Sequence, residues 1–196
     1  MALTHEQIER YSRQLIVGEM GGVAQQRLLA STVLLAGDLE RLEPVLYYLV
    51  GAGVGRLELR PAEPGGDRAR ILAHARALNP DVAITADDEP PRPAHLAALF
   101  IGSAASRALA QALCARGQFD SAIITRLDHP AAITILDTPP PPELLRPFTR
   151  PAAVSDLVTM VAATEILKTL AGITDHSGRR IDFDGYAARL AAPRTA

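Results

Sequence analysis

The sequence of 196 residues has one cysteine, no tryptophan and no long apolar run, and these absences exclude several classes of protein. Cys114 alone cannot form an internal disulfide or a zinc site built from several cysteines. This indicates a reducing compartment, so the cytoplasm is the expected location. No apolar stretch reaches the roughly 20 residues that a membrane-spanning helix needs. Residues 1–6 lack the basic and apolar regions of a signal peptide, so we expect neither export nor membrane insertion.

An excess of charge of either sign is also absent. Lysine and arginine number 20 and acidic residues 22, which gives a net charge of -2 and a pI near 6.2. No polybasic face is therefore available to hold nucleic acid or anionic lipid. Lys168 is the only lysine, and the histidines show no metal-ligand spacing. We therefore predict no bound metal, and Lys168 is the only candidate for an ammonium group acting on a phosphate.

The composition that is present, 48% hydrophobic and 21% charged residues, is typical of a globular protein, and the length fits one domain. Short apolar runs alternate with segments of helical period. They predict strands over 32–37, 56–60, 82–85, 99–101, 121–125 and 132–136, helices over 4–15, 23–30, 67–78, 104–116 and 154–170, and a final hairpin over 179–183 and 186–190. Thr4 and Gln7 form a capping-box pattern, and Pro44 suits the first turn of a helix that ends at Gly51 to Gly53.

This order predicts an α/β fold, a Rossmann-like and mostly parallel sheet with helices on both faces and a C-terminal hairpin. We expect a single domain over 1–196, with N-terminal helices in 1–30, the Rossmann-like core in 31–137, and the closing helix and hairpin in 143–196. Ligands of such folds bind beyond the carboxyl ends of the strands, and the first of these ends is Gly37.

Several segments together resemble the ThiF/MoeB/HesA family of adenylating enzymes, which are related to the ubiquitin-activating enzymes. The segments are RYSRQ at Arg10 to Gln14, GAGVGRLEL at Gly51 to Leu59, LNP at Leu78 to Pro80, AATEILK at Ala162 to Lys168, and FDG at Phe183 to Gly185. Each motif is weak alone, but their order and spacing cover nearly the whole chain. We therefore expect a shortened and degenerate member of this family.

The resemblance implies formation of an acyl-adenylate from MgATP on the C-terminal carboxylate of a small ubiquitin-like or sulfur-carrier protein. In the family, backbone N–H groups of a glycine-rich loop after the first strand approach the phosphates. Here that loop, GDLERLE at Gly37 to Glu43, keeps only its first glycine and contains three acids. A carboxylate about 5 Å from a phosphate charge opposes binding by roughly 3 kcal/mol at an effective dielectric of about 20. Arg41 offsets only part of this repulsion.

Further elements of the family's pattern are missing or shortened. Arg60-Pro61 replaces the acid that holds the ribose hydroxyls. The run 62–66 lacks the arginine and asparagine series, and Asp67 stands where an ungapped count places a lysine. Gly102 to Ser106 contains no magnesium-binding aspartate. The paired zinc cysteines are absent, and the crossover that clamps the carrier's tail is shortened to Pro139 to Pro142.

One element of the family pattern is retained, the second arginine of the N-terminal motif, here Arg13. In the family this arginine reaches across the dimer interface towards ATP in the other subunit. Heterodimeric relatives pair a catalytic chain with one that has lost its own site. The resemblance therefore implies a non-catalytic interaction or regulatory subunit with no cofactor, in a homodimer or in a heterodimer with an active paralogue. Arg13 would act in trans, and Gly37 and Arg41 would be remnants of the nucleotide loop.

Alternatives stay open at this point. An active adenylating enzyme with a diverged loop would use ATP and magnesium on a small ubiquitin-like carrier. A dinucleotide-binding oxidoreductase would need the glycine fingerprint and acidic ribose partner that this chain lacks. Arg13 could equally form a surface ion pair, and Cys114 fits a small buried thiol. The apolar segment Leu46 to Val50 is expected to be buried against a partner.

Overall fold

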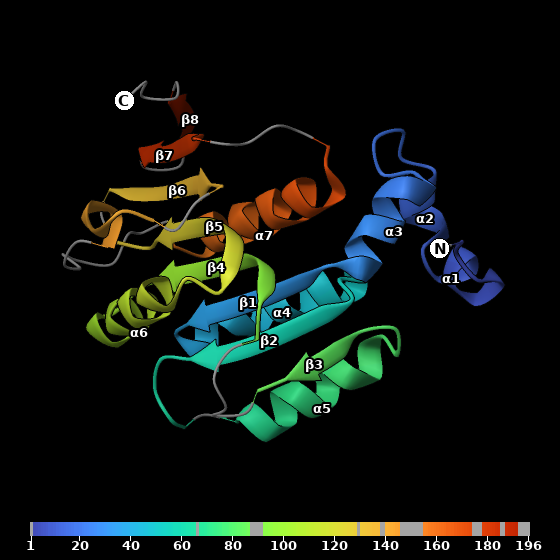
Figure 1. The fold of residues 1–196 in the computed structure, drawn as a ribbon, viewed down its shortest axis with the longest axis horizontal. Coiled ribbons are helices and arrows are strands. Elements are labelled where there is room, and N and C mark those ends of the chain that lie inside the picture. Colours follow the sequence, from blue (N-terminus) through green and yellow to red (C-terminus); the bar gives the residue numbers. More distant parts are fainter. Residues whose placement is uncertain are drawn as a thin grey trace.

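The computed structural model describes residues 2–65, 67–86, 92–128, 130–137, 140–145, 155–173, 178–184 and 187–191. At its centre is an eight-stranded sheet with the strand order β3-β2-β1-β4-β5-β6-β7-β8 (Figure 1). The strands are β1 (Thr32–Gly37), β2 (Arg56–Pro61), β3 (Ala83–Thr85), β4 (Ala94–Ile101), β5 (Phe119–Arg126), β6 (Ala131–Leu136), β7 (Arg180–Asp184) and β8 (Ala187–Ala191). The helices are α1 (His5–Arg10), α2 (Ser12–Leu15), α3 (Gly22–Ala30), α4 (Leu39–Ala52), α5 (Arg68–Leu78), α6 (Ala104–Arg116), the 3-10 turn η1 (Pro142–Leu145) and α7 (Ser155–Ala171).

The sheet is parallel in its first half and antiparallel in its second. Strands β3, β2, β1, β4 and β5 pair in parallel, whereas β6, β7 and β8 follow in antiparallel pairs. The last pair is the predicted C-terminal hairpin. The predicted α/β class, with a mostly parallel sheet and helices on both faces, is thus confirmed. Among the described helices, none combines the length and the apolar character that crossing a membrane requires.

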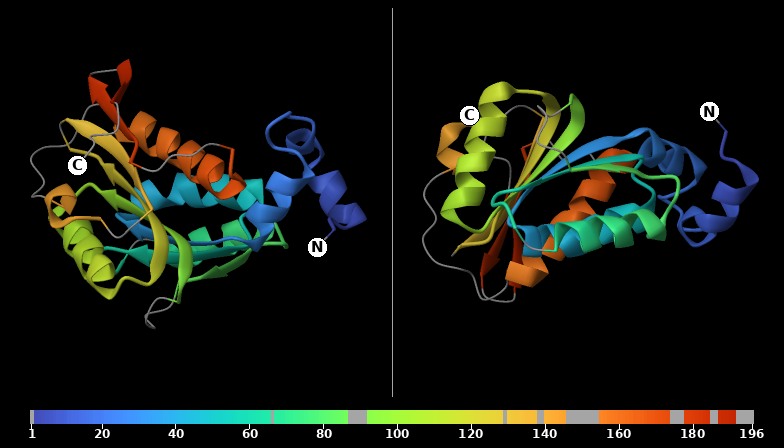
Figure 2. Two further views of the ribbon diagram at one scale, coloured as in Figure 1. Left: turned by 45° about the horizontal axis from the view of Figure 1, so that its top comes forward. Right: turned by 90° about the horizontal axis from the view of Figure 1, so that it is seen from below.

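Side chains that alternate along the strands build one core on each face of the sheet. Leu35 of β1 belongs to the core beneath α4, α5 and α7, whereas its neighbour Leu34 belongs to the core beneath α6. Successive side chains of a strand point to opposite faces, so a strand that is buried on both faces is apolar throughout. Figure 2 shows α6 on one side of the twisted sheet, with α4, α5 and α7 on the other.

The helix after β1 begins earlier than predicted. It starts at Leu39 rather than beside Pro44, so the loop expected to replace the family's glycine-rich loop is the first turn of α4. The side chains present there, leucine, glutamate and arginine, favour helix where glycines would not. Pro44 lies within the helix and removes only one backbone hydrogen bond. The helix ends as predicted at Gly53, which has a φ of 83°.

Two other predictions need correction. The first helix is interrupted at Tyr11, whose φ and ψ of -97° and 10° separate α1 from α2. The segment Leu46 to Val50 is not an exposed surface that a partner would cover, because Leu46, Leu49 and Val50 are fully buried in the chain's own core. Only Tyr48, 42% exposed, presents substantial apolar surface there. Of the shortened crossover Pro139 to Pro142, Pro139 lies outside the described residues, and Pro142 begins η1.

Candidate functional site

The crevice where a ligand is expected lies at the carboxyl ends of β1 and β4. These strands are neighbours, and the helices that follow them, α4 and α6, cover opposite faces of the sheet. This is a topological switch point, the usual ligand position in an open α/β sheet. Gly37 pairs with Phe100 at this edge. Its φ is 153°, and a Cβ there would lie 2.5 Å from the Phe100 carbonyl oxygen, so the position requires glycine.

Asp38 places its carboxylate at this edge of the sheet, next to the start of α6. The residue precedes α4 as its N-cap, but its side chain makes no capping bond to that helix. It turns instead to the start of α6, where it accepts hydrogen bonds from Ser103 Oγ at 2.7 Å and Ser106 Oγ at 3.2 Å. Its Oδ2 also lies 2.8 Å from where a Cβ of Gly102 would stand. Asp38, the residue after Gly37, is thus bound to α6 and not to α4, the helix that it precedes.

The first turn of α6 is satisfied within the chain. The Ser106 hydroxyl accepts from the Gly102 and Ser103 backbone N–H groups at 3.0 and 2.9 Å, and Ser103 Oγ accepts from the Ser106 N–H at 3.1 Å. Both hydroxyls donate to Asp38. The N-terminus of a helix favours a negative charge, and here that charge is an internal carboxylate. The sequence predicts the acid at 38 and the missing acid in 102–106 as two separate departures from the family pattern. In the structure Asp38 is in direct contact with Ser103 and Ser106 of that segment.

The other charged residues of this region are also paired internally. Arg41 forms ion pairs with Asp156 of α7 and, at 3.4 Å, with Glu40. Glu43 accepts from the Tyr47 hydroxyl at 2.9 Å and from Arg70 Nη2 at 3.1 Å. The hydrogen bond to Glu43 is the main cause that raises the pKa of Arg70. The ion pair between Arg41 and Asp156 links α4 to α7.

Arg60 near the end of β2 and Asp67 before α5 also have structural roles. Arg60 donates to Oε1 of Glu58, a residue 3% exposed, from Nε at 2.9 Å. Asp67, placed by the ungapped count at the family's lysine, caps α5 by accepting from the Arg70 N–H at 3.3 Å. Neither arrangement presents a carboxylate for a ribose or a cation for a phosphate.

Arg13 lies apart from this crevice, on the outer side of α2. Its side chain is exposed and makes no hydrogen bond or ion pair with any residue in the described part of the chain. The intrachain ion pair that was the structural alternative for Arg13 is therefore not seen there.

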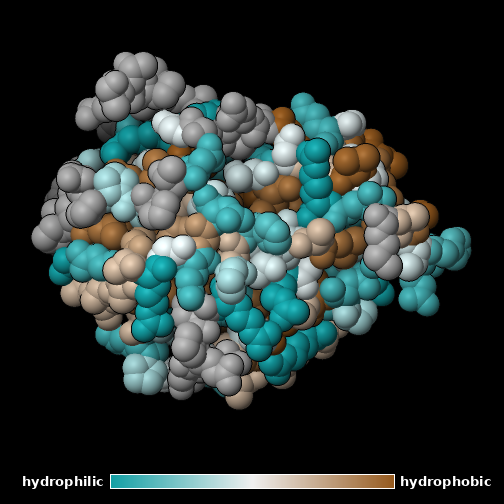
Figure 3. All heavy atoms as spheres, viewed as in Figure 1, coloured by the Kyte–Doolittle hydropathy of each residue, from teal (hydrophilic) through white to brown (hydrophobic). Residues whose placement is uncertain are grey.

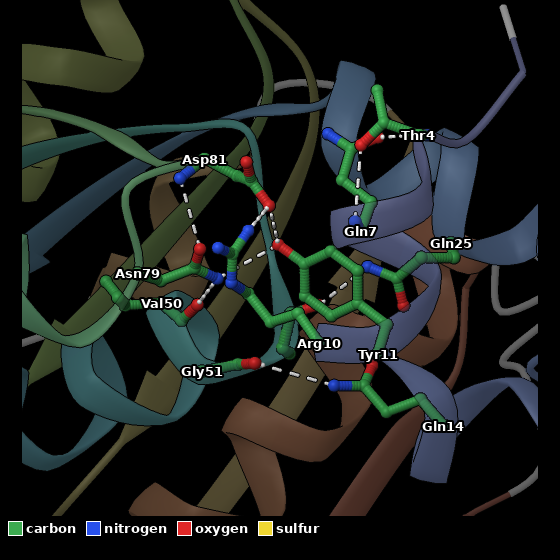
Figure 4. Close-up of polar contacts among 11 residues, drawn as sticks. Thr4, Gln7, Arg10, Tyr11, Gln14, Gln25, Val50, Gly51, Asn79 and Asp81 are labelled. Atoms are coloured by element: carbon green, nitrogen blue, oxygen red, sulfur yellow. Dashed lines mark hydrogen bonds and ion pairs between the residues drawn. The ribbon is translucent and has the colours of Figure 1, made fainter.

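The segment that carries Arg13 is held to the body of the protein by a clamp of four residues, Arg10, Tyr11, Asn79 and Asp81 (Figure 4). The Tyr11 hydroxyl donates to Asp81 Oδ2 at 3.0 Å and accepts from Asn79 Nδ2 at 3.0 Å. Arg10 pairs with the same carboxylate. Tyr11 is 1% exposed, and burial is the main cause that raises its pKa.

Two of the segments on which the resemblance rests thus meet in this clamp. Asn79 also donates to the Val50 carbonyl oxygen at 2.8 Å, which ties the clamp to α4. The Tyr11 ring lies 2.6 Å from where a Cβ of Gly53 would stand, so the end of α4 must be glycine. Sequence reasoning identified these motifs but missed that they bind each other. The only signal for this contact in the sequence was that both motifs occur in the same chain.

Other candidate residues do not assemble a reactive centre. Burial raises the pKa of the Cys114 thiol to about 11, so it is a poor nucleophile. Lys168 Nζ lies 2.7 Å from Glu165 Oε1 on the same helix, so the one ammonium group is paired with a buried carboxylate. In the described ranges, no three histidine, cysteine, aspartate or glutamate side chains lie close enough together to hold a metal ion.

Known proteins share parts of this sequence. No protein-family model matches the chain. The mouse adenylyltransferase and sulfurtransferase MOCS3 is 29% identical over 235 residues, which cover 96% of this chain and 50% of the relative. The sulfur carrier protein adenylyltransferase of Thermus thermophilus is 35% identical over 104 residues, which cover 44% of this chain and 38% of the relative. The chain spans half or less of the length of these curated relatives.

A solved structure shares the fold. Escherichia coli MccB with succinimide superposes with a TM-score of 0.69 over 94% of this chain and 71% of that chain. The identity is 12%, so this likeness concerns the fold alone. The sequence relatives confirm the family resemblance that the five segments predict, and the solved structure confirms the fold.

Proposed function

We propose, from the premise that this chain is a relative of the ThiF/MoeB/HesA adenylating proteins, that it is a non-catalytic subunit of that kind. It would associate with a second copy or with an active paralogue, and in the latter case act beside the partner's small ubiquitin-like carrier. The observation that supports this most is the position of Asp38. Its carboxylate lies where the carboxyl ends of β1 and β4 meet the start of α6, hydrogen-bonded to Ser103 and Ser106.

A nucleotide phosphate in this crevice would meet that carboxylate directly. Two unit charges of like sign 4 Å apart repel each other by about 4 kcal/mol at an effective dielectric of about 20. Displacing Asp38 would also leave the hydroxyls of Ser103 and Ser106 without their acceptor. Ion pairs hold Arg41, the nearest basic residue of the loop, against Asp156 and Glu40, so it offers little compensation. We therefore expect no useful affinity for MgATP.

Titration calorimetry with MgATP tests the proposal. The wild-type chain should give no saturable heat at nucleotide concentrations up to about 1 mM, where a Kd corresponds to about -4 kcal/mol. Two variants separate the contact of Asp38 with Ser103 and Ser106 from the general negative charge of the turn. Asp38→Gly removes the contact, whereas Glu40→Ala removes only an exposed acid of the same turn. Micromolar binding to the wild-type chain would contradict the proposal and favour the active adenylating enzyme.

Arg13 is the candidate for a role in a heterodimer. Its guanidinium is exposed and unpaired within the described residues, and the clamp through Tyr11 fixes the helix beside it. Arginine stays charged and can bind two phosphate oxygens at once, so it suits stabilisation of a partner's nucleotide in trans. This role needs an active paralogue, because the chain's own crevice is occupied by Asp38.

A further inference from the structure

The amino ends of the three central strands, β1, β4 and β5, are joined at His95. Its Nδ1 accepts a hydrogen bond from the backbone N–H of Thr32, the first residue of β1, at 2.9 Å. Its backbone carbonyl oxygen accepts from Ser121 Oγ of β5, also at 2.9 Å. The backbone pairing of β1 with β4 begins only at Val33 and Leu96. The imidazole therefore takes the place of a backbone acceptor at the first residue of β1.

This contact fixes the protonation state of the ring. A ring nitrogen that accepts a hydrogen bond carries no proton, so the imidazole that binds Thr32 is neutral and has its proton on Nε2. A ring that gains a second proton, at Nδ1, has no lone pair left for the Thr32 N–H and would place two hydrogens against each other. Histidine side chains change their charge between about pH 5 and pH 8. The bond between His95 and Thr32 is therefore available only to the neutral ring.

The charged groups that face His95 come from two other elements. His95 lines two hollows, of about 350 and 540 Å³. The smaller one contains Arg27 of α3 beside residues of α7, and the larger one contains Asp120 of β5. The other residues that line the two hollows carry no charge. A cation and an anion thus face the ring from different sides of its surroundings.

The ring and both charged groups are open to solvent. Hydrophobic residues of the surface gather mainly where Figure 1 draws α7 and the N-terminal helices, and hydrophilic residues are spread over much of the remaining face (Figure 3). His95, Arg27 and Asp120 are all exposed. Water and protons therefore reach the ring, and the larger hollow gives it room to turn.

Asp120 is the neighbour of His95 across the parallel pair of β4 and β5. The residues on both sides of His95 pair with those on both sides of Asp120, so the register places the two next to each other. Such neighbours lie on the same side of a sheet, on strands about 4.8 Å apart. Because β4 lies between β1 and β5, Thr32 and Asp120 lie on opposite sides of the ring. The Asp120 carboxylate forms no ion pair or hydrogen bond with any residue that the structure describes.

We propose that His95 is a pH-dependent switch at the amino ends of the central strands. The neutral ring is bound to Thr32 of β1, and the protonated ring releases Thr32 and turns to the carboxylate of Asp120 on β5. Arg27 supports the same turn, because its positive charge repels a charged ring in the smaller hollow. Rotation of one exposed side chain connects the two states, so the change is local. The switch does not depend on the proposed function, since it lies at the end of the sheet opposite to the crevice of Asp38.

Nuclear magnetic resonance of the full chain tests the switch. At about pH 8 the ring nitrogens of His95 should report an unprotonated Nδ1 and a proton on Nε2. Between about pH 8 and pH 5 the amide resonance of Thr32 should move in step with the resonances of the His95 ring. Over the same range, the protection of this amide from hydrogen exchange should fall by about threefold to tenfold, as expected for the loss of one hydrogen bond.

Two variants separate the parts of the switch. His95→Asn keeps an acceptor near the position of Nδ1 but cannot gain a proton, so its Thr32 amide should not respond to pH in this range. Asp120→Asn removes the partner of the protonated ring and should move the response of the Thr32 amide to lower pH. His74→Asn and Asp137→Asn are the matched controls, because each changes an exposed residue that lines neither hollow. Both should respond like the wild-type chain.

The outcomes distinguish the two contacts of the ring. A Thr32 amide that does not respond between about pH 8 and pH 5, or that responds equally in His95→Asn, would overturn the switch. A wild-type response in Asp120→Asn would overturn the turn of the ring towards Asp120. All four substituted side chains are exposed, so circular dichroism should show an intact fold in every variant.

Discussion

Tyr11→Phe removes the hydroxyl at the centre of the N-terminal clamp and changes nothing else. The hydroxyl accepts from Asn79 and donates to the Asp81 carboxylate, both at 3.0 Å, and the residue is 1% exposed. A hydrogen bond to a charged group contributes about 1.5 to 3 kcal/mol, and the loss leaves a buried Asn79 N–H without one acceptor. For a domain of this size, each kcal/mol shifts the melting temperature by about 2 to 4 °C. We therefore expect Tm to fall by about 4 to 10 °C.

Thermal unfolding followed by circular dichroism measures this shift, with Tyr48→Phe as the control. Tyr48 is 42% exposed, and its hydroxyl makes no hydrogen bond within the described residues, so Tm should change by less than about 1 °C. Burial raises the pKa of Tyr11, so its contribution is full below the ordinary value near 10 and is lost as pH rises through the raised pKa. The difference between the wild-type chain and Tyr11→Phe should therefore shrink above about pH 10. Equal melting temperatures for the two variants at pH 7 would refute the clamp.

Further predictions concern single residues. Gly37→Ala should destabilise the fold by about 3 kcal/mol or more, because the new Cβ would meet the Phe100 carbonyl oxygen at 2.5 Å. Denaturant unfolding measures this loss. Gly51→Ala is the control, because its Cβ would lie in open space, and it should stabilise α4 by about 1 kcal/mol. Cys114, with its pKa raised to about 11, should react with a disulfide reagent at pH 7.5 roughly 100-fold more slowly in the native than in the unfolded chain, and an equal rate would contradict its burial. Arg13→Ala should lower the adenylation rate of a reconstituted pair with an active paralogue by about tenfold or more without weakening the fold; pyrophosphate exchange at the wild-type rate would remove the role in trans.

Periodicity was sufficient to predict most of the fold. The strand 32–37 and the helix 104–116 have the predicted bounds, because each combines a clear apolar pattern with a clear end signal. The start of α4 was predicted too late because Pro44 was placed in the first turn of the helix, whereas residues 39–43 are helix formers that precede it. The break at Tyr11 was missed, and Tyr11 is held by a contact with Asn79, 68 residues away, that no local pattern records.

For the candidate site, the sequence was sufficient to predict only which residues of the family pattern are missing. The sequence shows that the loop after Gly37 carries acids, but not that Asp38 turns towards Ser103 and Ser106, since hydrogen bonds between residues 65 and 68 positions apart depend on the sheet order. A groove lined by Val17, Tyr48 and Leu167 was also beyond prediction. It joins three segments that only the packing of α4 against α7 brings together.

The most direct test of the closed crevice is a nucleotide titration followed through backbone amide resonances. The amides of Gly37, Asp38 and Gly102 lie at the carboxyl ends of β1 and β4, and the Gly102 N–H is already bonded to Ser106 Oγ. If Asp38 closes the site, MgATP at about 1 mM should leave these resonances in place in the wild-type chain. Saturable shifts confined to these three amides would contradict the account and show that the crevice still binds nucleotide.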